Sequence, residues 1–438
     1  MEQSYRFFEN RACAYFPCHD LSGDFNCLFC YCPFYTRPVC PGNPTFITKE
    51  DGRTIKRCTD CAFPHKPEHY EQIMALLRQG APDFASGEYH HGGETTDTHL
   101  ARADFSVNTN PLGMSESVKR ALIDAVDSCE RYPDQNCTAL RALLSQKLGV
   151  DGRELFFGNG ASEVISLIVQ ALKPKRALLI APTFSGYERA LRTNGSEIHY
   201  HFLKRAQNFA LDETIFDTLV RVKADILFLC TPNNPTGARI DDNLLEKIAA
   251  YCEEQGVSLV VDECFLDFIP DAKSTMRLTH KKLITLNAFT KTYALAGLRL
   301  GYARIRSDAL LARMNALRPE WNISNAAQIA GVVALNERGY LEKTQRLIAT
   351  ERKFLEEKLK ALGFHVISGE ANFLLITEND KIDSKKSEKI DMLLQKQGIF
   401  VRNCASFPGL TARDIRIAIK SHEDNCLLVN SLTEILHS

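Results

Sequence analysis

The sequence lacks any long apolar run, and its charges nearly cancel. No stretch of the 438 residues is apolar over enough length to cross a bilayer, and residues 1–6 lack the apolar core of a targeting peptide. The 53 lysines and arginines face 54 aspartates and glutamates, so the overall charge gives no support for nucleic-acid binding. We therefore expect a cytoplasmic protein that binds neither membranes nor nucleic acid.

Internal repeats and low-complexity stretches are also missing. Apolar residues make up 45% of the chain and charged residues 24%, which is typical of a globular protein with a sizeable core. This length predicts two or three domains. Residues 79–83, QGAPD, have the composition of a linker between modules.

One stretch, NAFTKTYALAGLRLGY at 287–302, carries the strongest chemical signal. Lys291 follows the hydroxyl residue Thr290 after an apolar strand, and Arg299 comes eight residues later. This order suits pyridoxal phosphate (PLP), since the amine can form a Schiff base while the guanidinium and the hydroxyl bind the phosphate. A single lysine in such a stretch is more often a solvated helix residue, so the prediction depends on other segments.

Three further segments support this cofactor. TPNNPTG at 231–237 follows the apolar run 225–230, VVDE at 260–263 ends another, and GNGASE at 158–163 opens an amphipathic run. Short apolar strands alternate with helical patterns such as 243–255, which predicts an α/β fold with a mostly parallel sheet. Ligands bind beyond the carboxyl ends of such strands, where Asp262 and Lys291 are expected.

The order and spacing of these four segments resemble the fold type I aminotransferase superfamily, from about residue 84 to the C-terminus. The resemblance implies that Lys291 binds PLP and then acts as general base or acid. It implies that Asp262 pairs with the protonated pyridine nitrogen and that Asn234 donates to the phenolic oxygen. The other implied cofactor contacts are Ala161, Ser162, Phe184, Thr290, Arg299 and, from the neighbouring subunit of a homodimer, Tyr132.

The same resemblance implies the domain organisation. A small α+β domain would combine residues 84–135 with 320–438, and a large PLP-binding domain would span 136–319. Two positions depart from the superfamily pattern. Phe265 stands where many members have a tyrosine that touches the phenolic oxygen, and Ala288 stands where many have a phosphate-binding serine. Neither change removes Lys291 or Asp262, so activity is still expected.

The ends of this region indicate the substrate. His-Gly-Gly at 91–93, NTNPLG at 108–113, WNISN at 321–325 and the arginines at 402 and 416 resemble the L-threonine-O-3-phosphate decarboxylase family. The residues implied to bind the substrate's phosphate and carboxylate are His91, Gly92, Asn108, Asn234, Arg402 and Arg416, with Asn110 equally well placed. The expected reaction is decarboxylation of O-phospho-L-threonine, or O-phospho-L-serine, to aminopropanol or ethanolamine phosphate for cobalamin biosynthesis.

Two alternative functions stay open at this point. One is a histidinol-phosphate aminotransferase, because the same residues can serve either reaction and a sequence does not define which Cα bond breaks. The other is a metal-dependent binding or regulatory protein with a degenerate PLP fold. The presence of Lys291, Asp262, Asn234 and Arg299 argues against this second alternative.

The first eighty residues form a different, cysteine-rich module. Its spacings, Cys27-x-x-Cys30-x-Cys32 and Cys58-x-x-Cys61, let thiolates converge on a metal. The expected ligands are Cys13, Cys18, Cys27, Cys30, Cys32, Cys40, Cys58 and Cys61. Eight thiols suit two tetrahedral zinc sites, with an iron–sulfur cluster as a second choice. A disulfide-stapled module and a nucleic-acid-binding zinc ribbon are the competing interpretations, and the module resembles a small domain associated with cobalamin genes.

Overall fold

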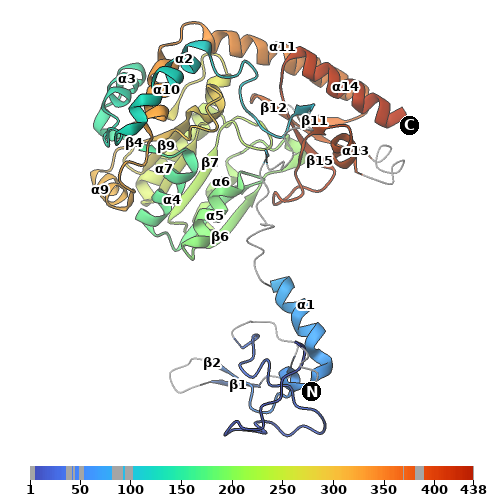
Figure 1. Cartoon of the computed structure of the whole chain (residues 1–438). Helices are drawn as coiled ribbons and strands as arrows, with labels where there is room; N and C mark the ends of the chain where they lie inside the picture. Colours follow the sequence, from blue (N-terminus) through green and yellow to red (C-terminus); the bar gives the residue numbers. More distant parts are fainter. Residues whose placement is uncertain are drawn as a thin grey trace. The chain divides into compact units, whose positions relative to one another are not determined.

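The computed structural model describes residues 5–35, 42, 45–48, 54–80, 92–93, 102–367, 369–379 and 389–437. The chain divides into two compact units, Met1–Glu88 and Tyr89–Ser438 (Figure 1). Across the described ranges, no helix has the length and apolar character to cross a membrane. The fourteen cysteines described are all free thiols.

The first unit contains little regular structure. Strands β1 (Thr45–Thr48) and β2 (Thr54–Arg57) form an antiparallel hairpin, and α1 (Tyr70–Gly80) follows. The expected linker at 79–83 therefore starts too early, because residues 79 and 80 complete α1; residues 81–83 lie outside the described ranges. The rest of the described chain in this unit consists of turns and short 3-10 segments.

The second unit is built on a seven-stranded sheet. Its strands are β4 (Leu155–Gly158), β5 (Arg176–Ala181), β6 (Glu197–Phe202), β7 (Ile226–Cys230), β8 (Ser258–Asp262), β9 (Leu283–Ala288) and β10 (Gly301–Ile305). They lie in the order β4-β10-β9-β8-β7-β5-β6. From β6 to β9 all neighbours are parallel, and β10 runs antiparallel to both β9 and β4. The prediction of a mostly parallel α/β sheet is confirmed.

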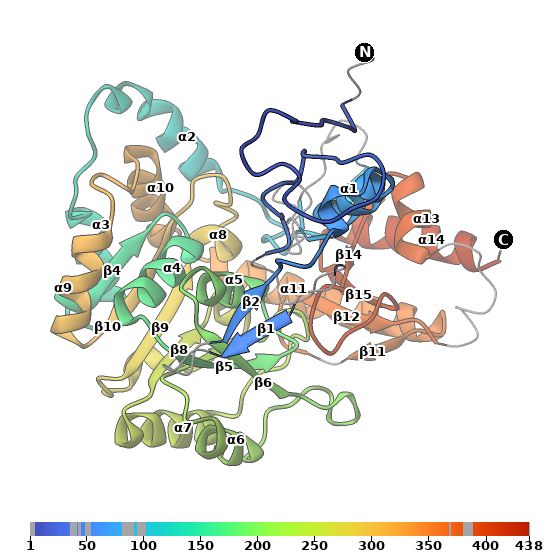
Figure 2. The ribbon, with the colours of Figure 1, turned by 90° about the horizontal axis from the view of Figure 1, so that it is seen from below.

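Helices cover both faces of this sheet, as Figures 1 and 2 show. The helices of the second unit are α2 (Glu116–Asp124), α3 (Thr138–Leu148), α4 (Ala161–Leu172), α5 (Ser185–Thr193), α6 (Thr214–Val222), α7 (Asp242–Gln255), α8 (Phe289–Thr292), α9 (Asp308–Leu317), α10 (Asn325–Asn336), α11 (Tyr340–Ala361), α13 (Ile390–Lys396) and α14 (His422–His437). Successive residues of a strand point to opposite faces. Accordingly, Phe228 packs in the core under α4, α5 and α9, whereas Leu227 and Leu229 pack in the core under α6 and α7.

A smaller antiparallel sheet lies toward the C-terminus. Its strands are β11 (His365–Ile367), β12 (Phe373–Thr377), β15 (Asp414–Ala418) and β14 (Arg402–Asn403), in that order. Beside it, β3 (Ala103–Asp104) pairs in parallel with β13 (Ile399–Phe400). Backbone bonds tie Phe105 to both regions, because its N–H donates to Phe400 (2.7 Å) and its carbonyl accepts from Ala418 (2.9 Å). Residues 106–108 are thereby held next to β15.

Candidate active site

A cavity of about 290 Å³ opens at the carboxyl ends of β7, β8 and β9. Cys230, Asp262 and Ala288 end these three strands and line the cavity. The predicted site residues that line it are Gly92, Asn108, Ala161, Ser162, Phe184, Asn234, Asp262, Thr290, Lys291, Arg299, Arg402 and Arg416. Segments far apart in the sequence therefore converge on one volume, as expected beyond the carboxyl ends of a parallel sheet.

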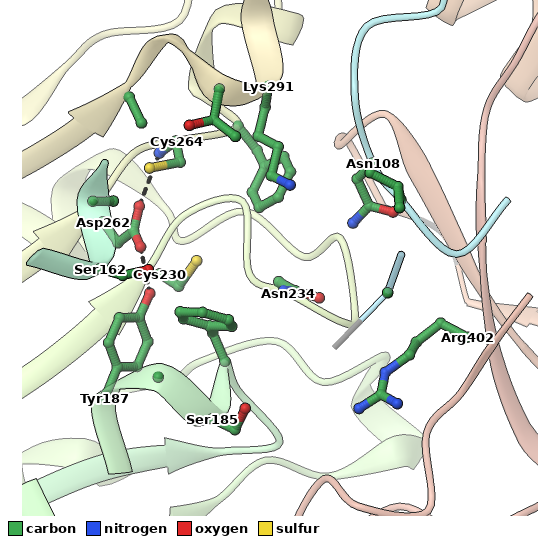
Figure 3. A pocket seen from close by; sticks show the side chains of 18 of the residues that line it. Asn108, Ser162, Ser185, Tyr187, Cys230, Asn234, Asp262, Cys264, Lys291 and Arg402 are labelled. Atoms are coloured by element: carbon green, nitrogen blue, oxygen red, sulfur yellow. Dashed lines mark hydrogen bonds between the residues drawn. The ribbon is translucent and has the colours of Figure 1, made fainter. Parts of the chain in front are cut away.

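Lys291 lies on the short helix α8, directly after β9. Burial and the positive charges of Arg416 and Arg299 together lower the pKa of its amine to about 8. The side chain keeps some exposure and points into the cavity (Figure 3). A much larger fraction of this amine is therefore neutral and nucleophilic near neutral pH than for a surface lysine, whose pKa is about 10.4.

Asp262 ends β8 and is almost fully buried. Its Oδ2 accepts a 2.6 Å hydrogen bond from the hydroxyl of Tyr187, and its Oδ1 accepts a 3.0 Å bond from the backbone N–H of Cys264 (Figure 3). Burial raises the carboxyl pKa, and these two donors oppose the rise. A buried carboxylate held in this way is stabilised by a cationic partner. A protonated ring nitrogen in the cavity fits that requirement.

The start of α4 and Arg299 form a cradle for an anion. The first N–H groups of a helix have no partner within the helix and carry partial positive charge. Arg299 has a φ of 57°, an uncommon left-handed conformation for a non-glycine residue. Gly160 has a φ of 79°, where a side chain would be strained, and a Cβ there would displace the Arg299 guanidinium. Together with Ala161 and Ser162, this arrangement suits a phosphate.

Two arginines lie opposite each other on adjacent strands. Arg402 of β14 pairs in register with Arg416 of β15, and both side chains are buried at the cavity. Arg416 donates 2.6 Å bonds to Asn234 Oδ1 and to the Ser106 carbonyl, and burial lowers its pKa to about 10. Like charges facing each other across strands destabilise a sheet. An anionic ligand in the cavity would stabilise these two facing cations.

Gly92 and residues 106–108 line this side of the cavity. A side chain at Gly92 would overlap the carbonyl of Ser106, so only glycine fits. In the described part of the protein, Asn108 Oδ1 is buried without a hydrogen-bond partner. Figure 3 shows Asn108 and Arg402 on the same side of Asn234. An amide whose oxygen lacks a partner is suited to a polar ligand group.

Two predicted residues, Tyr132 and Asn110, do not line this cavity, and a third, His91, lies outside the described residues. Tyr132 is 79% exposed and stacks on Trp321 at 4.4 Å, away from the lining residues of its own chain. Its contact with a neighbouring subunit stays a prediction. Asn110 is buried and uses its amide to bond Thr292 and Thr344, so it supports α8 and does not line the cavity.

Sequence reasoning missed several lining residues. The most important is Tyr187, which is fully buried and orients Asp262. Its position six residues after the end of β5 was a usable signal, but an aromatic there is usually core. Cys230, Cys264, Ser106 and Phe407 also line the cavity and were not predicted as site residues. Phe265 and Ala288, noted as departures from the pattern, also line the cavity.

A family model for aminotransferase class I and II matches residues 102–432. The chain belongs to the aminotransferase class I and II family. A second model, described as a cysteine-rich small domain, matches residues 4–83. PLP is the cofactor of this aminotransferase family, and the cavity described above suits it.

Two similar sequences and one similar solved structure narrow the comparison within this family. Threonine-phosphate decarboxylase of Salmonella typhimurium is 38% identical over 337 residues, 76% of this chain and 91% of that one. The adenosylcobalamin biosynthesis bifunctional protein CobDQ of Leptospira interrogans is 32% identical over 76% of this chain and 39% of its own length. The crystal structure of histidinol-phosphate aminotransferase from Clostridium acetobutylicum superposes with a TM-score of 0.71 at 28% identity, covering 76% of this chain and 99% of that one.

The cysteine-rich unit also brings potential ligands together. Ligand atoms of Cys18, His19 and His65 all lie within 4.8 Å of one another. A nearby cavity of about 250 Å³ is lined by His19, Cys30, Tyr31, Cys32, Tyr35, Cys58, Cys61, Pro64 and His65. Of the other predicted metal ligands, Cys13 lies in a turn, Cys27 begins the turn to Cys30, and Cys40 is outside the described residues. The histidines at this cluster were not among the expected ligands.

Proposed function

We propose that this protein decarboxylates O-phospho-L-threonine with PLP, forming aminopropanol phosphate for cobalamin biosynthesis. The family assignment and the threonine-phosphate decarboxylase of Salmonella typhimurium support the proposal. The name of the Leptospira relative supports the pathway.

The pair Arg402 and Arg416 is the observation that carries the proposal. A phosphorylated amino acid has two anionic ends, a carboxylate and a phosphate. The cavity offers two buried guanidinium groups on adjacent strands, beside Asn108 and within the same lining as Lys291. Planar guanidinium groups bind such oxyanions through paired hydrogen bonds. A phosphorylated amino acid supplies one anionic group for each of these two cations, whereas an unphosphorylated amino acid supplies a single carboxylate.

When bound, PLP supplies an electron sink for the bond that breaks at the substrate's Cα. Lys291 would hold the cofactor through its Nζ, and the same amine would hold or move a proton beside the reacting carbon. Asp262, oriented by Tyr187, would keep the ring nitrogen protonated. Asn234 would donate to the ring's phenolic oxygen through its amide nitrogen, because its Oδ1 already accepts from Arg416. Phe184 offers an aromatic face to the ring.

The choice between decarboxylation and amino transfer depends on which Cα bond is held perpendicular to the ring. A substrate bound at both its carboxylate and its phosphate has little freedom to rotate about its Cα–N bond, and such positioning accounts for much of the catalytic effect. We assign the grip to Arg402, Arg416, Asn108, Gly92 and His91. O-phospho-L-serine differs by one methyl group, which is worth about 1–3 kcal/mol of discrimination. We therefore expect it to be a poorer substrate.

We further propose that the enzyme is a cytoplasmic homodimer in which Tyr132 reaches the neighbouring subunit's cofactor phosphate. Its exposed ring, stacked on Trp321, is available for such a contact. The cysteine-rich unit would bind zinc, or less favourably iron, through its thiols. Its high density of free thiols and few buried apolar side chains support a structural metal.

The experiment compares carbon dioxide release from O-phospho-L-threonine and O-phospho-L-serine by the PLP-loaded full chain, with Lys291→Ala as control. We expect release that depends on Lys291 and is faster with the threonine derivative. The rival activity is histidinol-phosphate amino transfer, suggested by the similar Clostridium acetobutylicum structure. The decarboxylase proposal would be wrong if the unmodified chain released no more carbon dioxide than Lys291→Ala. Amino transfer from histidinol phosphate to 2-oxoglutarate would then assign the aminotransferase activity instead.

A further inference from the structure

The cysteine-rich unit has too small an apolar core to account for its order by burial alone. In its described ranges, the buried hydrophobic side chains are Phe25, Phe34, Cys61 and Ile73, and the buried polar residues are Asn26 and His65. Units with so few apolar contacts usually need a disulfide or a metal. The described cysteines form no disulfide, so their thiols are available as metal ligands.

His65 is the most firmly held polar side chain in this unit. It is 1% exposed, its ring stacks on Phe25 at a centroid distance of 4.5 Å, and its Nδ1 lies 3.0 Å from the Asn26 carbonyl. A carbonyl oxygen only accepts, so Nδ1 carries the proton and Nε2 presents a lone pair. Histidines that bind metals are fixed in this way by a bond from the opposite ring nitrogen.

The free nitrogen of His65 faces the thiol of Cys18. Its Nε2 lies 3.8 Å from Cys18 Sγ. In a tetrahedral zinc site, bond lengths of about 2.3 Å to sulfur and about 2.0 Å to nitrogen place those two atoms roughly 3.6 Å apart. The observed separation matches that edge of the tetrahedron. His65 and Cys18 are therefore already spaced to share one ion.

His19 completes the group. Its Nδ1 lies 3.4 Å from Cys18 Sγ, and the ligand atoms of Cys18, His19 and His65 all lie within 4.8 Å of one another. Cys30 lines a cavity together with His19 and His65, and its N–H donates to the Cys27 carbonyl (3.2 Å) in the tight turn typical of a Cys-x-x-Cys segment.

Asn26 connects these parts. Its carbonyl accepts from His65, its Oδ1 accepts from the backbone N–H groups of Phe8 and Leu28, and its amide donates to the Arg6 carbonyl. The same residue thus orients the imidazole and fixes the loop that carries Cys27. This arrangement fixes the ring whose Nε2 faces Cys18.

We propose that one metal ion is bound by Nε2 of His65 together with the thiolate of Cys18 and Nδ1 of His19. The assignment rests on the proposed metal-binding role of this unit and changes its chemistry, because two ligands are imidazoles and the site is not all thiolate.

The test measures metal binding by the untagged full chain carrying His65→Ala, with His69→Ala as the matched control. His69 is held similarly, by a 3.0 Å contact of its Nδ1 with the Phe63 carbonyl and by stacking on Phe63 at 4.3 Å, but it lies outside the ligand group. We expect His65→Ala to lose one Zn²⁺ per chain, or to bind it at least tenfold more weakly. His69→Ala should match the unmodified chain.

Co²⁺ absorption distinguishes lost ligation from misfolding. The His65→Cys variant should regain the ion and show stronger sulfur-to-cobalt charge transfer than the unmodified chain. Zinc X-ray absorption on the unmodified protein, which needs no variant, should show imidazole scattering. An all-sulfur shell would overturn the assignment, as would metal loss in His19→Ala with none in His65→Ala. A purified unmodified chain that binds no Zn²⁺ would overturn the metal-binding role itself, while Lys291-dependent decarboxylation tests the proposed function separately.

Discussion

Replacing Arg402 by methionine should separate substrate binding from folding. The side chain is buried opposite Arg416, and its guanidinium donates to Ser406 Oγ at 2.9 Å. Removing one of two facing like charges relieves about 0.2–1 kcal/mol of repulsion. We therefore expect the ligand-free Arg402→Met protein to unfold at an unchanged or slightly higher temperature.

The same change should weaken substrate binding strongly. Losing one charge-assisted grip costs about 1.5–3 kcal/mol, roughly 10- to 150-fold in Kd. Substrate at about 100 times the Kd stabilises the folded protein by roughly 2.7 kcal/mol, and a 100-fold weaker variant would retain only about 0.4 kcal/mol at the same concentration. Thermal unfolding with and without O-phospho-L-threonine measures both effects, and kcat/KM should fall in parallel.

Arg205→Met is the matched control, because Arg205 pairs with Asp414 of the same sheet. Arg205 pairs with Asp414, a fully buried carboxylate, at 2.8 Å, and its own side chain is 36% exposed. Its loss leaves a buried charge with fewer partners, at a cost of about 1–3 kcal/mol after allowance for solvent screening. This variant should unfold earlier and keep its substrate-induced shift. A ligand-free Arg402→Met protein that is strongly destabilised, with an intact substrate shift, would refute the reasoning.

Three further predictions concern the cofactor site. The PLP-free protein should capture PLP faster as the pH rises through about 8, because the Lys291 amine reacts in its neutral form. Arg416→Gln should move the midpoint of this pH dependence upward, since Arg416 lowers the pKa of Lys291. Stopped-flow absorbance measures the capture rate in both proteins. Tyr187→Phe removes the 2.6 Å bond to Asp262, one of the donors that hold its pKa down, so kcat should fall about tenfold at unchanged stoichiometry of bound PLP, the expected size for a single charge-assisted bond; an unchanged kcat would mean that this bond does not tune the ring. Tyr132→Ala should weaken PLP affinity without changing the ligand-free unfolding temperature, and equal affinity by equilibrium dialysis would exclude the cross-subunit contact.

Much of the catalytic half was predictable because its signals are local. Asp262 and Lys291 each follow a short apolar strand, and topology alone brings the ends of such strands together. The strands around them were predicted from apolar runs that the parallel sheet requires to be buried on both faces. Gly160 and Arg299 were found for the same reason, since a helix start and the chain after the lysine have recognisable patterns.

The remaining features depend on packing between distant segments. Tyr187 meets Asp262 across 75 residues of sequence, and nothing local distinguishes it from a core aromatic. Both Arg402 and Arg416 were expected at the substrate, but their direct register follows from how β14 pairs with β15. In the cysteine-rich unit the thiol spacings were visible, whereas His65 joins them only through the bond to Asn26, 39 residues away.

The most direct test of the decarboxylase proposal counts turnovers per chain. Purified protein with one PLP per chain would be mixed with carboxyl-labelled O-phospho-L-threonine and no keto acid, and both released carbon dioxide and phosphorylated product would be quantified. A decarboxylase restores its cofactor in each cycle, so many equivalents of carbon dioxide and aminopropanol phosphate per chain are expected. Amino transfer without a keto acid stops after one amino group per chain and retains the labelled carboxylate, and that result would contradict the proposal.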